Sequence, residues 1–136
     1  PRIFYYTGLA CEALGDRKAA GEFYEKASSC DDVDDEYLYY QAMAYSKTGK
    51  KKEAEEIFKR MIRMGQEQLE DTEAAVDFFA KFGGDLTDNQ RKGISCHIMA
   101  LGYLGQGDTA SAREYFTKSM EADVNQLWSK VYLESL

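Results

Sequence analysis

The residues of this chain with the clearest capacity for chemistry are one histidine and three cysteines. His97 directly follows Cys96, and a histidine beside a thiol suggests a metal ligand or a general base. Adjacent helix positions point about 100° apart, so these two side chains do not easily share a ligand. The sequence marks no further His or Cys at metal-ligand spacing and no acid that would orient the histidine. We therefore expect His97 to line a groove or to pack, with no catalytic residue, no metal site and no cofactor.

The cysteines, Cys11, Cys30 and Cys96, are odd in number and lack CxxC spacing. This usage favours a reducing compartment such as the cytoplasm over a disulfide framework. Cys11 and Cys96 fall on predicted buried helix stripes, where a thiol acts as a small core residue. A reactive thiol is the alternative that the sequence leaves open.

Charge is spread along the chain. The formal net charge is −7 and the longest basic run is Lys50–Lys52, so the cationic surface that nucleic acid requires is missing. The acidic run Asp31–Glu36 lacks the alternating ligands, central glycine and terminal glutamate of a calcium loop, and we expect a solvated turn there. No apolar run approaches the ~20 residues that cross a bilayer. These features predict a soluble chain that neither binds nucleic acid nor inserts into a membrane.

Helical hairpins are the elements that position these residues, and the first one begins the chain. A Gly-Asp pair at positions 15–16 separates two apolar-periodic runs, each with one packing stripe. Gly8 and Ala20 allow the two backbones to approach closely, Tyr24 fills the space beside them, and Gly15 permits the turn. The first stripe is Phe4, Gly8 and Cys11, and the second is Ala20, Tyr24 and Ala27.

The spacing of this hairpin returns twice. Gly15 recurs as Gly49, 34 residues later, and then as Gly107. The other recurring places are Ala20 as Ala54 and Ala112, Glu22 as Glu56 and Glu114, Tyr24 as Phe58 and Phe116, and Lys26 as Arg60 and Lys118. This period and this pattern of small and aromatic residues resemble the tetratricopeptide (TPR) repeat. The resemblance implies an all-α array of helical hairpins that winds into an α-α superhelix.

We predict a single domain with three repeats and two additional segments. The step from Gly49 to Gly107 is 58 residues, 24 more than one period, which indicates an inserted helix between repeats 2 and 3. A last amphipathic segment would cover the exposed end of the array as a capping helix. The segments are repeat 1 at about 1–34, repeat 2 at about 35–68, the insertion at about 69–92, repeat 3 at about 93–124 and the capping helix at about 125–136. Because the helical pattern is already under way at Pro1, we interpret the chain as a C-terminal fragment of a larger protein.

Two local features complete this organisation. The inserted helix, expected over 66–82, has a wide apolar set that includes Phe78, Phe79 and Phe82, which is buried on more than one side or forms an exposed patch. Self-association into a homo-oligomer through that patch stays open. Thr87 or Asp88 is expected to cap the following helix. The covering side of the capping helix is expected to carry Leu127, Trp128, Val131, Tyr132 and Leu136.

The resemblance also places a functional surface, because the first helices of successive TPR units line a concave groove. The best-known peptide mode of the family clamps a terminal carboxylate with Lys and Asn, whereas the matching places here hold Tyr5, Leu9, Tyr40 and Ile98. Neutral side chains do not replace cationic donors toward a carboxylate, so we expect a more apolar guest. The predicted partner-binding residues are Tyr5, Leu9, Glu12, Tyr39, Tyr40, Met43, Ser46, His97 and Leu101.

Two functions are suggested by these features. The first is a non-catalytic protein-protein interaction or assembly module whose apolar-aromatic groove binds a helix or extended segment. The second is a structural C-terminal domain that packs on other domains of the same chain. It is suggested because residues 78–105 are similar to the C-terminal repeat region of large bacterial proteins with an N-terminal sugar-mutarotase-like β domain. That second resemblance implies a carbohydrate-related parent, and no sugar-binding residue comes with it. We expect no enzyme, since no nucleophile, metal set or phosphate loop is present.

Overall fold

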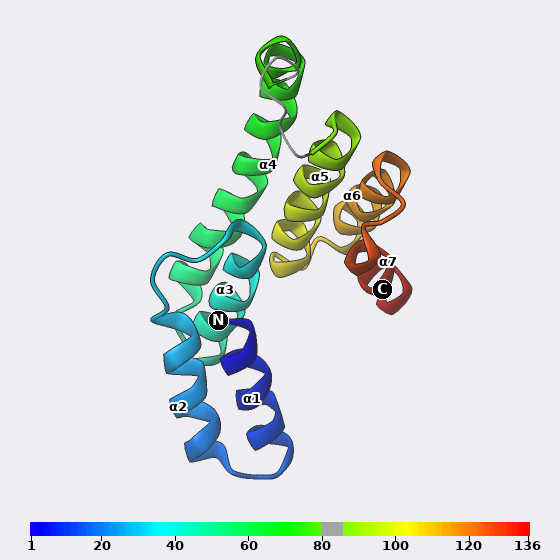
Figure 1. Cartoon of the computed structure of the whole chain (residues 1–136). Helices are drawn as coiled ribbons and strands as arrows, with labels where there is room; N and C mark the ends of the chain where they lie inside the picture. The colour runs from blue at the N-terminus through cyan, green and yellow to red at the C-terminus, as the bar shows by residue number, and fades with distance from the viewer. Residues whose placement is uncertain (80–85) are drawn as a thin grey trace. The chain divides into compact units, whose positions relative to one another are not determined.

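The computed structural model describes the backbone of residues 1–79 and 86–136, and the side chains of 1–71 and 86–136. Every regular element in the described ranges is helical, as the sequence predicts (Figure 1). The chain divides into two compact units, Pro1–Lys59 and Arg60–Leu136. Each unit is built from hairpins of antiparallel helices and is considered by itself.

Unit 1 contains α1 (Arg2–Ala13), α2 (Arg17–Ser28), the short 3-10 helix η1 (Asp35–Tyr37), α3 (Leu38–Lys47) and the first part of α4 (Lys51–Phe79). Figure 1 shows α1 and α2 side by side as a hairpin. Its turn contains Gly15 at φ 84°, a conformation that favours glycine, and the next turn contains Gly49 at φ 83°. Asp16 caps α2 by accepting a hydrogen bond from the backbone N–H of Ala19 at 3.0 Å. These turns confirm the predicted role of the recurring glycine, although Lys50 follows Gly49 where Asp16 follows Gly15.

The core of the first hairpin forms where α1 and α2 approach most closely. Ala20, Tyr24 and Ala27 are buried, as predicted for the second stripe. A Cβ atom added to Gly8 would lie 2.5 Å from Cε1 of Tyr24, so only glycine fits opposite this ring. Phe4 differs from the prediction: it is 38% exposed, because it lies at the edge of the packed side of α1.

Two glycines of this hairpin make a matched test of that close approach. Gly8→Ala forces a methyl group into the ring of Tyr24, and we expect it to lower the free energy of unfolding by about 1–3 kcal/mol. Gly21→Ala, inside α2 with open space around the site, should raise that free energy by about 0.5–1 kcal/mol through helix propensity alone. Urea unfolding of both variants measures the difference. Equal effects of the two substitutions would contradict the packing argument.

Unit 2 contains the remainder of α4 with α5 (Asp88–Gly105), α6 (Thr109–Ala122) and α7 (Leu127–Ser135). Thr87 caps α5, and Gln90 completes a capping box with it, which confirms the predicted start of this helix. The turn between α5 and α6 repeats the signal of unit 1, since Gly107 has φ 81° and Asp108 accepts from the N–H of Ser111. The hairpin predicted for the third repeat is therefore present.

The inserted segment takes a form that the sequence did not suggest. Rather than a separate helix, its helical part is the continuation of α4, which runs unbroken to Phe79. No turn signal interrupts this stretch, and Gly65 within it is buried against Met99 and the carbonyl of Ser95, so it serves close packing instead of a turn. Residues 80–85 and the side chains of the predicted Phe78, Phe79 and Phe82 patch lie outside the described residues. The repeat boundaries and the single-domain assignment stay predictions.

Helix α7 packs on α6, and the side that it turns inward includes Tyr132 and Leu136 of the predicted set but not Leu127, Trp128 or Val131. Leu127, Trp128 and Val131 are 67%, 52% and 52% exposed. Ser129 is fully buried instead, and the ring of Tyr132 stacks on Phe116 at 5.3 Å between centroids. The inward side is the stripe Ser129, Tyr132, Leu133 and Leu136, whose last three residues are apolar and partly buried.

Candidate protein interaction site

Helices α1 and α3 bring four tyrosines of unit 1 together. Tyr5 and Tyr6 are consecutive on α1, and Tyr39 and Tyr40 are consecutive on α3. The ring centroid of Tyr40 lies 6.0 Å from that of Tyr5 and 5.6 Å from that of Tyr6. Tyr39 extends the cluster into the core, 5.4 Å from Tyr40 and 6.1 Å from Phe58. Tilted and edge-on ring pairs at these separations each contribute about 0.5–1.5 kcal/mol beyond the area that they bury.

The four tyrosines differ in exposure: one is accessible to solvent and the other three are buried beneath it. Tyr5, Tyr39 and Tyr40 are 6%, 8% and 6% exposed, whereas Tyr6 is 51% exposed. A phenol is neutral at physiological pH, and burial raises the pKa of Tyr5 and of Tyr39 still further above it. Tyr6 therefore presents its ring to solvent and is supported underneath by packed, neutral tyrosines.

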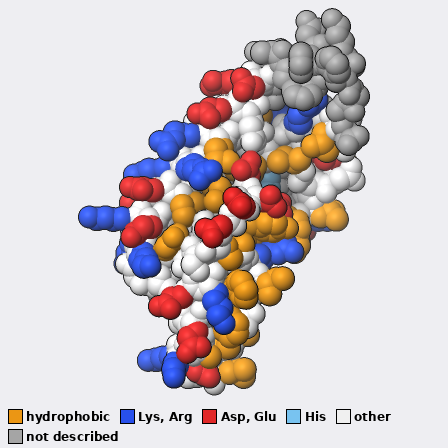
Figure 2. Space-filling model, turned by 60° about the vertical axis from the view of Figure 1, so that its left-hand side comes forward, with side chains coloured by type: hydrophobic (Ala, Val, Ile, Leu, Met, Phe, Trp, Pro, Cys, Tyr) orange, Lys and Arg blue, Asp and Glu red, His pale blue; other side chains and the backbone are white. Residues whose placement is uncertain are grey.

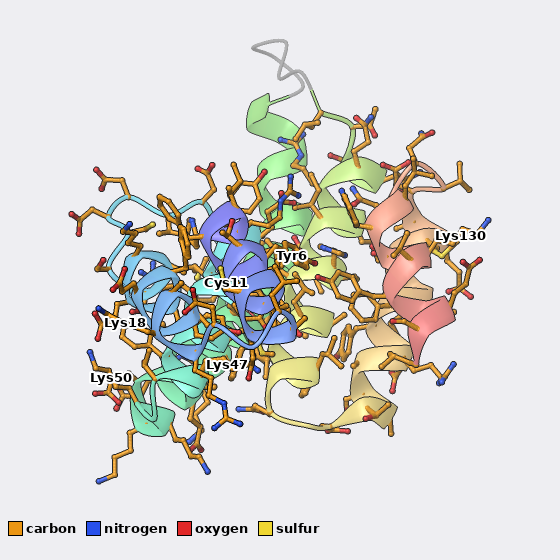
Figure 3. The ribbon with its side chains drawn as sticks, turned by 90° about the horizontal axis from the view of Figure 1, so that it is seen from below. Tyr6, Cys11, Lys18, Lys47, Lys50 and Lys130 are labelled. Atoms are coloured by element: carbon orange, nitrogen blue, oxygen red, sulfur yellow. The ribbon has the colours of Figure 1, made fainter. Side chains whose placement is uncertain are left out.

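Two further predicted residues lie one helical turn from members of this cluster. Leu9 is one turn along α1 from Tyr6, Met43 is one turn along α3 from Tyr40, and both are half-buried. We call Tyr5, Tyr6, Leu9, Tyr40 and Met43 the tyrosine face. Tyr6 and Cys11 leave α1 on different sides, which sets the tyrosine face apart from the half-buried thiol (Figure 3). A rigid aromatic ring flanked by adaptable aliphatic side chains suits contact with a protein segment.

Glu12 and Ser46, also predicted as partner contacts, already have partners within unit 1. The Glu12 carboxylate accepts from the Tyr24 hydroxyl at 2.6 Å and pairs with the Lys47 ammonium at 2.7 Å. Hydrogen bonds from Lys47 and then Tyr24 lower the pKa of Glu12 below its usual value. The Ser46 hydroxyl donates to the carbonyl of Ala42. The contacts of Glu12 join α1, α2 and α3, and the sequence does not reveal the role of Lys47, labelled in Figure 3, because its partner lies 35 residues away.

In unit 2, His97 and Leu101 are 5% and 1% exposed, so α5 directs both into the packing of that unit. The Nδ1 atom of His97 lies 2.7 Å from the Ser129 hydroxyl of α7. Ser129 donates to the hydroxyl of Ser119 on α6 at 2.8 Å, and Ser119 donates to the carbonyl of Gly93 at 2.7 Å. Three helices are therefore joined through one buried chain of hydrogen bonds.

The direction of these hydrogen bonds determines whether His97 acts as a donor or as a general base. Each serine has one hydroxyl proton: Ser119 donates its proton to the carbonyl of Gly93, and Ser129 donates its proton to Ser119. Ser129 has no proton left for His97, so it accepts a hydrogen bond from Nδ1–H of His97. A general base would instead accept the serine proton, and Ser129 is fully buried, away from any substrate. Burial lowers the pKa of His97 to about 4, which keeps the ring neutral. These hydrogen bonds hold α7 against α5 and α6, which agrees with the packing role that was one of the two predictions for His97.

The sequence contains one local signal for this network. Ser119 occupies the place that holds Ala27 in the first hairpin, a small buried position. A hydroxyl at a buried position requires a partner, so a serine there indicates a polar contact with a neighbouring helix. Nothing in the spacing indicates that the partner is Ser129. That pairing depends on how α7 docks on α6.

The neutral state of His97 predicts a pH dependence of stability. The unfolded chain binds a proton near pH 6.5 but the folded chain only near pH 4, so stability falls as pH drops through this window. At pH 5 the loss from this residue should be about 2 kcal/mol relative to pH 7.5. His97→Gln keeps a donor toward Ser129 without titrating. Chemical unfolding at several pH values should show a shallower decline for His97→Gln, and parallel curves would contradict the assignment.

The cysteines fit the structural interpretation. Cys96 is 2% exposed, and burial raises the pKa of its thiol, which disfavours the reactive thiolate. Cys11 and Cys30 are half-buried, and the Cys30 thiol donates to the carbonyl of Lys26 at 3.2 Å. Reducing conditions stay a prediction from composition.

The charged surface is mixed. On the face in Figure 2, basic side chains are interspersed with acidic ones and do not form a separate patch. Within residues 1–71 and 86–136, no three His, Cys, Asp or Glu side chains gather in a way that could hold a metal ion. None of the helices described in the structure combines the length and apolar character needed to cross a membrane.

Comparison with known proteins supports the repeat pattern. Two family models, both described as tetratricopeptide repeat, match residues 2–31 and 36–63. No curated protein sequence matches the chain. Among solved structures, a chain titled "MamA RS-1 ArsTM double mutant" is 15% identical, with 97% of this chain and 80% of that chain covered and a TM-score of 0.31. Such a score does not establish a common arrangement of helices. The matched segments hold α1, α2 and α3, where the tyrosine face lies.

Proposed function

Because this chain carries tetratricopeptide repeats over residues 2–31 and 36–63, we propose that it is a non-catalytic protein-interaction module whose tyrosine face binds a segment of another protein. The observation that carries this proposal is Tyr6. Its ring is 51% exposed yet is held at 5.8 Å from the ring of Tyr5 and 5.6 Å from that of Tyr40. An aromatic side chain fixed before binding loses little entropy when a partner covers it.

The side chains of the tyrosine face favour a partner segment with apolar or aromatic side chains. Its five side chains are neutral, and the nearby Lys47 ammonium is engaged by Glu12. A terminal carboxylate would find no free cation among these residues, whereas an apolar or aromatic side chain would meet tyrosine rings, Leu9 and Met43. A helix or an extended segment with one or two large apolar side chains therefore suits this face.

The proposal of a non-catalytic role is supported by the state of the side chains with catalytic potential. His97 is buried, neutral and committed as a donor to Ser129. The thiol of Cys96 is buried and protonated. Both groups are therefore engaged in the packing of unit 2, and we assign binding as the activity of the tyrosine face.

A selected peptide tests this function directly. Random 16-residue peptides displayed on phage are panned on the whole chain, and a synthetic copy of an enriched peptide is titrated by fluorescence anisotropy. We expect Tyr6→Ala to weaken binding at least tenfold, since a central aromatic contact is worth about 1–2 kcal/mol or more. Tyr6→Phe, which keeps the ring, should retain most of the affinity.

Two controls make the outcome specific. Met43→Glu places a charge on the tyrosine face and should abolish binding, while Tyr115→Ala removes a half-buried tyrosine from unit 2 and should leave it unchanged. Thermal melts followed by circular dichroism confirm that each variant is folded. Enriched peptides that bind Tyr6→Ala, Met43→Glu and the parent chain equally would refute the proposed face.

A further inference from the structure

Two tyrosines on the first helices of successive hairpins differ in what covers them. Tyr6 of α1 and Tyr40 of α3 are one repeat length of 34 residues apart. Tyr40 is 6% exposed, because the rings of Tyr5 and Tyr6 lie 6.0 Å and 5.6 Å from its own. Tyr6 is 51% exposed, so the described residues give it no comparable cover. Helix α1 thus covers the tyrosine of the next repeat, while the place that would cover its own tyrosine is open.

A second surface of α3 is covered by the second helix of the first hairpin. Helix α2 packs on α3, and the Nε2 atom of Gln41 donates to the carbonyls of Ser28 and Cys30, at 3.0 Å and 2.9 Å. Ala44, one turn along α3 from Gln41, is fully buried. The stripe of α3 that holds these two residues is therefore the surface on which α2 docks.

The corresponding stripe of α1 is uncovered. Thr7 and Ala10 stand one repeat length before the two docking residues of α3, and Ala10 is exposed. Ile3 and Leu14 extend this stripe by one turn in each direction, and they are 78% and 86% exposed. We call these four residues the outer stripe of α1. It has no charged side chain, and the Thr7 hydroxyl already donates to the carbonyl of Ile3 at 2.9 Å, so the stripe is better suited to a helix than to water.

We infer that a helical hairpin of the partner docks on α1 as the hairpin of α1 and α2 docks on α3, with its first helix over Tyr6 and its second helix along the outer stripe. This inference rests on the proposed function and identifies the segment that the tyrosine face binds as the first helix of that hairpin. Unit 1 itself carries the argument, because both equivalent surfaces of α3 are occupied by one hairpin. A lone helix or an extended segment would cover only one of the two surfaces.

The contacts within unit 1 also define the chemistry of the partner hairpin. Its first helix carries aromatic side chains opposite Tyr6, as α1 does opposite Tyr40. Its second helix has small residues opposite Ala10, because two helices approach closely only where the side chains between them are small. Toward the ends of the outer stripe it has apolar residues that cover Ile3 and Leu14, since a charge there would lose water without gaining a partner.

Residues 1–34 form a hairpin that makes both contacts on α3, so a second copy of them is the probe. The copy is fused directly before Pro1, which keeps the repeat length and gives the added hairpin a high effective concentration. Ala10→Cys is introduced into the original repeat, in the chain alone and in the fusion, in a background with every Cys11 and Cys30 changed to Ser. Labelling by a maleimide, followed by peptide mass spectrometry, should be slower by about tenfold or more in the fusion, because the added second helix covers the thiol.

A matched control and a second variant support this measurement. Leu127→Cys, at an exposed aliphatic position of unit 2, should be labelled at the same rate in the chain alone and in the fusion. Thr7→Gln in the original repeat supplies the amide that Gln41 uses at the corresponding place, and it should slow the labelling of Ala10→Cys in the fusion further. Equal labelling of Ala10→Cys in the chain alone and in the fusion, with and without Thr7→Gln, would overturn the inference.

The peptide selected on the tyrosine face separates this inference from the proposed function. In the fusion the added first helix should cover Tyr6 and weaken peptide binding by about tenfold or more. Slow labelling of Ala10→Cys with unchanged peptide binding would overturn the hairpin arrangement, because Tyr6 would still be open. Equal labelling, with peptide binding that still depends on Tyr6, would overturn this inference and leave the proposed function standing. Slow labelling, with peptide binding that does not depend on Tyr6 in the chain alone, would refute the proposed function and leave only the hairpin contact.

Discussion

The contact between Gly8 and the ring of Tyr24 sets the geometry of unit 1. Because Gly8 has no side chain, α1 and α2 approach until the ring covers its backbone, and the hydroxyl of that ring then reaches Glu12 at 2.6 Å. The Tyr24 ring also lies 5.9 Å from that of Tyr5, which in turn supports Tyr6 and Tyr40. The proposed binding face is therefore held in place by the same ring that closes the first hairpin.

Unit 2 uses a polar contact where unit 1 uses a close approach of backbones. The hydroxyls of Ser119 and Ser129 and the ring of His97 have few ways to be satisfied inside a helical core, so their mutual bonds fix the rotation of α7 on α6. With Ser129 facing α6, the apolar side chains of Tyr132, Leu133 and Leu136 share its side of α7 and are partly buried, while Leu127 and Val131 are exposed.

The surface to which we assign an interaction carries no charge. The tyrosine face is made of tyrosine, leucine and methionine side chains, which are neutral at physiological pH. A chain with a net charge of −7 repels acidic partners at long range. Surfaces without charge on such a chain are the places where close contact carries the least electrostatic cost.

The sequence by itself determined the hairpins, the glycines of their turns, the buried places of Ala20 and Tyr24, and a cap at Thr87 or Asp88, because each depends on local propensity and helical periodicity. Only the tertiary structure decided that α4 continues through the insertion, that Tyr5 and Tyr40 support an exposed Tyr6, and that Ser129 rather than Trp128 turns inward. Those outcomes depend on the rotation of one helix against another. Periodicity gives the stripes of a helix, but which stripe meets which neighbour is settled by packing and by the pairing of buried polar groups.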